Sequence, residues 1–166
     1  AKMNPPLRTQ ADVDAVIGGL KDGVIDVIAT DHAPHTIDEK KNVYTKAPSG
    51  GPLVQHALPA MLEMYHKGKI LIEKVVEKMC HNPAILFQIE KRGYVKEGYF
   101  ADLVLVDLNN PWTVKKDNIL YKCGWSPFEG TTFKSRVTHT FINGSLVYKN
   151  AEFTELKSAK RLTFNR

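Results

Sequence analysis

The sequence has few cysteines and no long apolar segment. Cys80 and Cys123 are its only cysteines, and they form no Cys-x-x-Cys pair. We therefore expect no disulfide framework, and this cysteine usage fits a reducing cytoplasm. Apolar runs such as 103–106 are far shorter than the roughly 20 residues of a membrane helix. No apolar core follows Ala1, so we expect neither a membrane span nor a signal peptide.

The charge pattern does not indicate a nucleic-acid-binding protein. The formal net charge is +5, part of it in the C-terminal tail, and no basic stripe is interleaved with aromatic residues. We therefore expect no nucleic-acid partner. With 43% hydrophobic and 25% charged residues, the composition is that of a globular domain, which excludes a disordered tail or a fibrous repeat. The 166 residues are too few for a complete (β/α)₈ barrel, which typically needs about 250.

Helical and extended patterns alternate in the first half of the chain. Thr9-x-x-Asp12 is a capping box before a helix whose apolar face ends at Leu20. Residues 24–29 predict a short buried strand that ends at Thr30-Asp31. Further helical patterns cover 58–65, 72–79 and 82–88.

After Gly93 the pattern changes to strands. Residues 103–106, 138–142 and 145–148 are predicted strands, and Asn143-Gly144 is a strong hairpin signal between the last two. We therefore divide the chain into an α/β part over 1–90, a small β-domain over 91–150 and a basic tail over 151–166.

The densest group of chemically active side chains is Asp31-His32-Ala33-Pro34-His35. It follows the predicted buried strand, and the carboxyl ends of strands form the rim on which α/β barrels build active sites. A carboxylate there suits metal binding or proton transfer, and a histidine suits metal or anion binding. A helix cap at Asp31 with two surface histidines is the plainer interpretation. The spacing alone does not separate the two.

Longer motifs carry a resemblance to a known family. Asn4-Pro5-Pro6-Leu7-Arg8, followed after 22 residues by Asp31-His32-Ala33-Pro34-His35, closely resembles the end of the barrel in the dihydroorotases of the cyclic amidohydrolase family. Further matching segments are 50–59, 82–84, 98–107, 126–130 and 141–144. The resemblance implies an α/β fold: the C-terminal part of a (β/α)₈ TIM-like amidohydrolase barrel, followed by part of a small β-sandwich domain.

The same resemblance implies roles for individual residues. Asp31 aligns with an aspartate that binds metal and acts as general base and acid. Asn4 aligns with a contact to the dihydroorotate ring, and His35 with the histidine that binds the substrate carboxylate. Ser49 and Gly50 align with backbone contacts to the substrate. The neighbouring His32 has no ligand role in the family pattern, so we expect it to pack beside the site.

The implied activity is the reversible, metal-dependent hydrolysis of (S)-dihydroorotate to N-carbamoyl-L-aspartate in pyrimidine biosynthesis. The cofactor would be zinc or another divalent metal, in a mononuclear or binuclear centre. In the family pattern a His-x-His pair and a lysine precede the region matched here, and this chain contains no His-x-His. We therefore expect a C-terminal fragment that is inactive alone and needs its N-terminal part.

Two alternatives remain. The first is a related cyclic amidase of the allantoinase or hydantoinase type, although Asn-Pro-Pro-Leu-Arg together with His35 favours dihydroorotase. The second is an inactive scaffold for aspartate transcarbamoylase, which the presence of Asp31 and His35 disfavours. A homo-oligomer or a complex with aspartate transcarbamoylase is compatible with the resemblance, and we expect a cytoplasmic protein.

Overall fold

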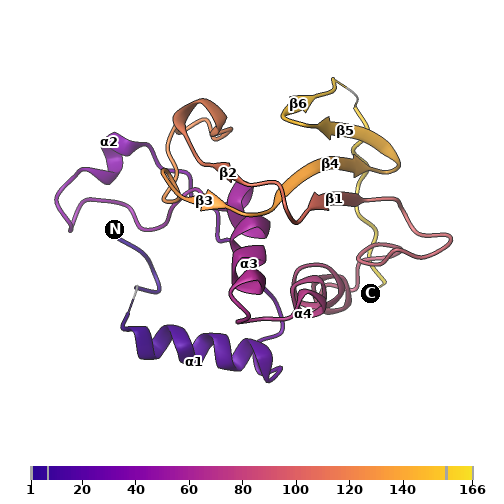
Figure 1. Ribbon diagram of the computed structural model, residues 1–166, viewed down its shortest axis with the longest axis horizontal. Helices are drawn as coiled ribbons and strands as arrows, with labels where there is room; N and C mark the ends of the chain where they lie inside the picture. The colour runs from indigo at the N-terminus through magenta and orange to yellow at the C-terminus, as the bar shows by residue number, and fades with distance from the viewer. Residues whose placement is uncertain (1, 7, 156, 166) are drawn as a thin grey trace.

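The computed structural model describes residues 2–6, 8–155 and 157–165. Its first half is helical, with short loops and one long loop between the helices (Figure 1). The helices are α1 (Gln10–Lys21), α2 (Ile37–Lys40), α3 (Ala57–His66), α4 (Ile72–Val76) and α5 (Asn82–Leu86). A 3-10 turn, η1 (Val54–His56), leads into α3, and a π-helical turn, η2 (Glu77–His81), joins α4 to α5. The predicted capping box is confirmed, because Thr9 and Asp12 bond each other reciprocally at the start of α1.

The second half forms two antiparallel sheets. The larger sheet has the order β1-β4-β5-β6, from β1 (Leu103–Asp107), β4 (Arg136–Ile142), β5 (Ser145–Lys149) and β6 (Glu152–Phe153). The smaller pairs β2 (Trp112–Thr113) with β3 (Thr132–Phe133), and a 3-10 turn, η3 (Lys116–Asn118), follows β2. Asn143 and Gly144 both have positive φ, +50° and +82°, as a tight hairpin turn requires. The predicted hairpin is thereby confirmed.

The core lies in two places. One group packs α1, α3 and α4 together, around the buried residues Leu20, Ile70 and Val75. The other, which we call the aromatic cluster, lies where the start of α3 meets β2 and β3. Its members are His56, Trp112, Tyr121, Phe128 and Phe133. In Figure 1, α3 begins beside β2 and β3 and runs toward α1, so this helix connects the strands with the helical half.

The segment 24–29 differs from its prediction. It joins no strand ladder among the described residues, and Val24 is 79% exposed. A strand needs a second extended chain about 4.8 Å away, whereas this segment lies beside η2 and α5. Ile28 N–H donates to the carbonyl of Lys78, and the Asn82 side chain donates to the carbonyl of Asp26. The segment still ends at Asp31, where the candidate site begins.

Within the described residues, no helix has both the length and the apolar content to cross a bilayer.

Candidate active site

The candidate site is built on the loop over 31–51, whose two ends lie side by side. His32 and Gly51 form a parallel bridge, and Ala33 N–H donates to the carbonyl of Gly51 at 3.1 Å. The Nδ1 atom of His32 accepts from Leu53 N–H at 3.1 Å. His32 therefore closes the two ends of the loop, in keeping with the packing role expected from the resemblance.

Asp31 begins this loop with an exposed side chain and a φ of +42°. Aspartate tolerates this left-handed conformation better than most residues do, and uncommon backbone conformations concentrate at functional sites. Within the part of the chain that the structure describes, no hydrogen bond or ion pair engages the Asp31 carboxylate. A free carboxylate at the start of such a loop is a suitable oxygen ligand for a divalent metal.

His35 projects from the same loop and is fixed through its backbone. Its N–H donates to the carbonyl of Ala33 at 2.9 Å, and its own carbonyl accepts from Trp125 Nε1 at 2.8 Å. The imidazole is partly exposed, with Nδ1 4.0 Å from a Glu39 carboxylate oxygen. Hydrogen bonds from Thr36 lower the pKa of Glu39, so this neighbour of the ring is anionic at neutral pH.

The far end of the loop requires glycine. Gly50 has a φ of +98°, and a Cβ there would lie 2.6 Å from the Cβ of Ala33. Gly50 N–H donates to the carbonyl of Lys2 at 3.1 Å, so this N–H is occupied within the protein. This end of the loop is therefore fixed to the N-terminal segment.

The structure connects most of the predicted site residues. Asn4 lies two residues after Lys2, whose carbonyl accepts from Gly50 N–H. The side chain of Asn4 is exposed and has no hydrogen bond within the described residues. Asp31 and His35 share one loop, and Gly50 contacts Ala33 between them. The segments that carry Asn4, His35 and Ser49 thus meet around one loop.

Residues from the β-half support this loop, and the sequence analysis assigned them no role. Trp125 contacts the loop in two places. It bonds the His35 carbonyl, and its indole ring packs against Gly51, where an added Cβ would lie 3.7 Å from the ring. The Tyr121 hydroxyl accepts from Gln55 N–H at 2.9 Å, and the Tyr121 ring lies 5.2 Å from the His32 ring. These contacts join residues 66 to 90 positions apart, and no local motif signals them.

His56 lies fully buried at the centre of the aromatic cluster. Its Nδ1 is 3.1 Å from both the Tyr121 hydroxyl and the Ser126 hydroxyl, while its Nε2 is buried with no hydrogen-bond partner. Burial lowers the pKa of His56 and raises that of Tyr121. Both groups are therefore neutral at neutral pH. Through Tyr121 they form a structural support behind the loop.

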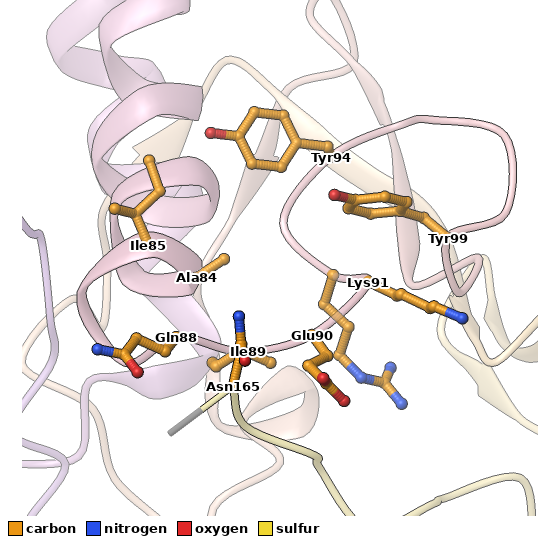
Figure 2. A pocket seen from close by; sticks show the side chains of 10 residues that line it. Ala84, Ile85, Gln88, Ile89, Glu90, Lys91, Tyr94, Tyr99 and Asn165 are labelled. Atoms are coloured by element: carbon orange, nitrogen blue, oxygen red, sulfur yellow. The ribbon is translucent and has the colours of Figure 1, made fainter.

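A separate hollow of about 390 Å³ lies away from this loop. Figure 2 shows it between Ala84 and Ile85 on α5 and the rings of Tyr94 and Tyr99, with Asn165 at its edge. The chain end reaches this place because Phe164 pairs with Ile89 in an antiparallel bridge. None of the predicted site residues lines this hollow.

Within residues 2–6, 8–155 and 157–165, no group of three or more His, Cys, Asp or Glu side chains is placed to hold a metal ion.

Comparison with known proteins gives a consistent result. The sequence profile of the amidohydrolase family matches residues 4–147. Curated dihydroorotases from Endomicrobium trichonymphae and Acetivibrio thermocellus are 44% and 45% identical to this chain over 149 and 150 residues. The alignments cover 89% and 90% of this chain but 35% of each relative. This chain therefore spans about a third of the length of these curated relatives.

Solved structures agree on the fold. The L-hydantoinase (dihydropyrimidinase) of Arthrobacter aurescens superposes with a TM-score of 0.85 at 29% identity, over 92% of this chain and 35% of that one. The D-hydantoinase of a Bacillus species (AR9) gives a TM-score of 0.86 at 26% identity, over 99% and 38%. The predicted fold class is confirmed, since these are amidohydrolases of the TIM-barrel type. With the family profile covering most of its length, the chain belongs to the amidohydrolase family.

Proposed function

We propose that this chain is part of a dihydroorotase that interconverts dihydroorotate and N-carbamoyl-L-aspartate. The observation that carries the proposal is the joined loop, which groups the free carboxylate of Asp31, the partly exposed ring of His35 and the segment of Asn4. The identity to curated dihydroorotases over about nine-tenths of this chain supports the same activity.

Asp31 is the proposed general base and acid. A divalent metal such as zinc, when bound, supplies a water of lowered pKa and polarises the amide. Asp31 would be one ligand of that metal. The carboxylate accepts a proton from the attacking water while the ring amide is opened. It then returns that proton to the leaving nitrogen.

Substrate recognition falls to the groups around the loop. The His35 imidazole binds the substrate carboxylate through a charge-assisted hydrogen bond. The exposed amide of Asn4 offers both a donor and an acceptor to the ring, and Ser49 adds a backbone contact. Since both dihydroorotate and N-carbamoyl-L-aspartate are anions, the positive charge of the chain (+5) favours their approach.

We infer that the remaining metal ligands lie in a longer protein that contains this chain. The curated relatives are about three times as long as the region matched here. That protein would act in the cytoplasm, in keeping with the two cysteines, which are free thiols in the structure. Its subunits would form a homo-oligomer or associate with aspartate transcarbamoylase.

A hydantoinase-type cyclic amidase is the second candidate, favoured by the superposition on two hydantoinases. The test is a substrate comparison on the full-length protein, with dihydroorotate, hydantoin, dihydrouracil and allantoin assayed under one set of conditions. We expect dihydroorotate to have the highest kcat/KM. A preference for hydantoin or dihydrouracil would replace the proposal with the second candidate, and metal-loaded protein inactive on all four would support the scaffold alternative.

A further inference from the structure

We propose that Lys40 is a positioning residue that fixes the two substrate-binding segments against each other. The proposal rests on the proposed function and deepens it. The Nζ atom of Lys40 lies 3.0 Å from the carbonyl oxygen of Lys2, 2.8 Å from that of Pro48 and 2.8 Å from that of Gly50. No sequence motif assigned this residue a role.

The number of partners matches the donor group. An ammonium group has three N–H donors and no acceptor, and each donor of Lys40 meets one carbonyl. Lys2 belongs to the segment of Asn4, whereas Pro48 and Gly50 flank Ser49. One cation therefore holds together both segments that are proposed to contact the substrate, and Gly50 N–H reinforces the junction by donating to Lys2.

Local sequence explains how Lys40 reaches this place. The Thr36 hydroxyl caps α2 by accepting from Glu39 N–H, and the Glu39 carboxylate accepts from Thr36 N–H to complete a capping box. Lys40 is the last residue of this single helical turn, five positions after His35. The turn thus links the proposed carboxylate-binding ring to the cation that holds the opposite side of the loop.

The charge of Lys40 is not used in an ion pair. It is partly buried, and within the described residues no carboxylate pairs with its ammonium group, although Glu39 is its neighbour in sequence. The Glu39 carboxylate turns instead to the backbone and hydroxyl of Thr36. Three carbonyl dipoles are therefore its partners within the described residues, and their convergence suits the compact ammonium better than a planar guanidinium.

The neighbouring Lys41 is a matched control. Its side chain is 70% exposed, and its Nζ lies 3.8 Å from an Asp38 oxygen. Removing that ammonium leaves every contact of the loop ends intact. Both variants, Lys40→Met and Lys41→Met, are to be made in the full-length protein.

Kinetics give the first test. We expect Lys40→Met to raise KM for dihydroorotate about 10- to 100-fold, because misplacing binding groups by about 1 Å has effects of that size. The decrease in kcat should be smaller, with metal content unchanged, because Asp31 lies outside the junction. Lys41→Met should keep KM within about twofold. Equal KM values for the two variants, or a loss confined to kcat, would overturn the proposal.

Lysine labelling of the unmodified full-length protein gives a test that requires neither activity nor a folded variant. Acetic anhydride at low dose, followed by mass spectrometry, should modify Lys41 at least tenfold faster than Lys40. Equal labelling would overturn the proposed junction. Protection of Lys40 in a protein that does not hydrolyse dihydroorotate would support the junction while rejecting the proposed function, so the two failures are distinguishable.

Discussion

The indole Nε1 of Trp125 donates a hydrogen bond to the backbone carbonyl of His35 at 2.8 Å. This bond joins the β-half to the loop that carries the proposed carboxylate-binding residue. The same indole packs against Gly51 at the loop's other end. The β-half therefore supports the site directly, although it contributes none of the predicted site residues.

Trp125→Phe in the full-length protein should weaken substrate binding. The change keeps an aromatic ring but removes the donor to His35, and a neutral hydrogen bond contributes about 1 kcal/mol. We expect KM for dihydroorotate to rise about fivefold with metal content unchanged. Trp112→Phe is the control, because it removes an equivalent bond to the carbonyl of Ser135, away from the loop. Equal effects on KM from both variants would contradict the assigned role.

Asp31→Asn should remove most of the turnover. The substitution takes away a general base and a charged metal ligand together, and general acid–base catalysis alone contributes about 10²- to 10⁴-fold. Measurements of kcat and of bound metal by elemental analysis on the full-length protein check this. Asp38→Asn, at an exposed carboxylate near Lys41, should leave kcat unchanged. Turnover of the Asp31 variant within tenfold of the unmodified enzyme would exclude this aspartate from the mechanism.

His35→Ala should mainly weaken binding of dihydroorotate. A charge-assisted hydrogen bond contributes about 1.5–3 kcal/mol, which corresponds to a loss in affinity of about 10- to 100-fold. Calorimetric titration and metal analysis separate binding from metal loading. His139→Ala, in β4 of the β-half, provides the control. If metal is lost together with affinity in the His35 variant, His35 is a metal ligand instead.

The buried His56 predicts a pH dependence of stability. Burial lowers its pKa in the folded state, so below the ordinary value of about 6.5 the unfolded chain binds more protons than the folded one. The contribution of neutral His56 to the stability of the folded protein is therefore fully present above a pH of about 6.5. It is lost as the pH falls toward the lowered pKa of His56 in the folded state. Urea unfolding of the full-length protein at pH 7.5 and 5.5 should show lower stability at pH 5.5. His56→Gln should reduce this difference, and an unchanged difference would assign the pH dependence to other groups.

The isolated 166-residue chain should not be a stable, active monomer. Apolar side chains lie exposed on α1, on α5 and next to these helices: Val13, Val16, Val24, Ile85, Leu86 and Phe87. Exposed patches of this kind mark interfaces or sites of aggregation. Light scattering should detect self-association, and the chain should not hydrolyse dihydroorotate. A monodisperse monomer that carries two metals and turns over substrate would refute this prediction.

Sequence reasoning succeeded where the signal is local. The capping box of Thr9 and Asp12 and the Asn143-Gly144 turn each depend on neighbouring residues, and both appear in the structure. The segment 24–29 shows the limit. Its composition indicates an extended conformation, but a strand also requires a partner, which its own sequence does not specify.

The candidate site shows the same division. The motif residues Asp31 and His35 stand out in the sequence because of their chemistry and spacing. The residues that hold the loop do not, because Lys40 looks like any surface lysine of a charged helix, and Trp125 lies 90 positions from its partner His35. Contacts of that separation follow from the tertiary fold and leave no periodic pattern in the sequence.

The distance along the chain between Trp125 and His35 also sets an order of events during synthesis. Residues 31–51 leave the ribosome well before Trp125 and Tyr121 do, and domains generally fold as their residues emerge. The capped turn of α2 and the bonds of Lys40 need no residue beyond Gly50. The partners of Lys40 are therefore all present early in translation, whereas the aromatic support of the loop is available only after the β-half has been made.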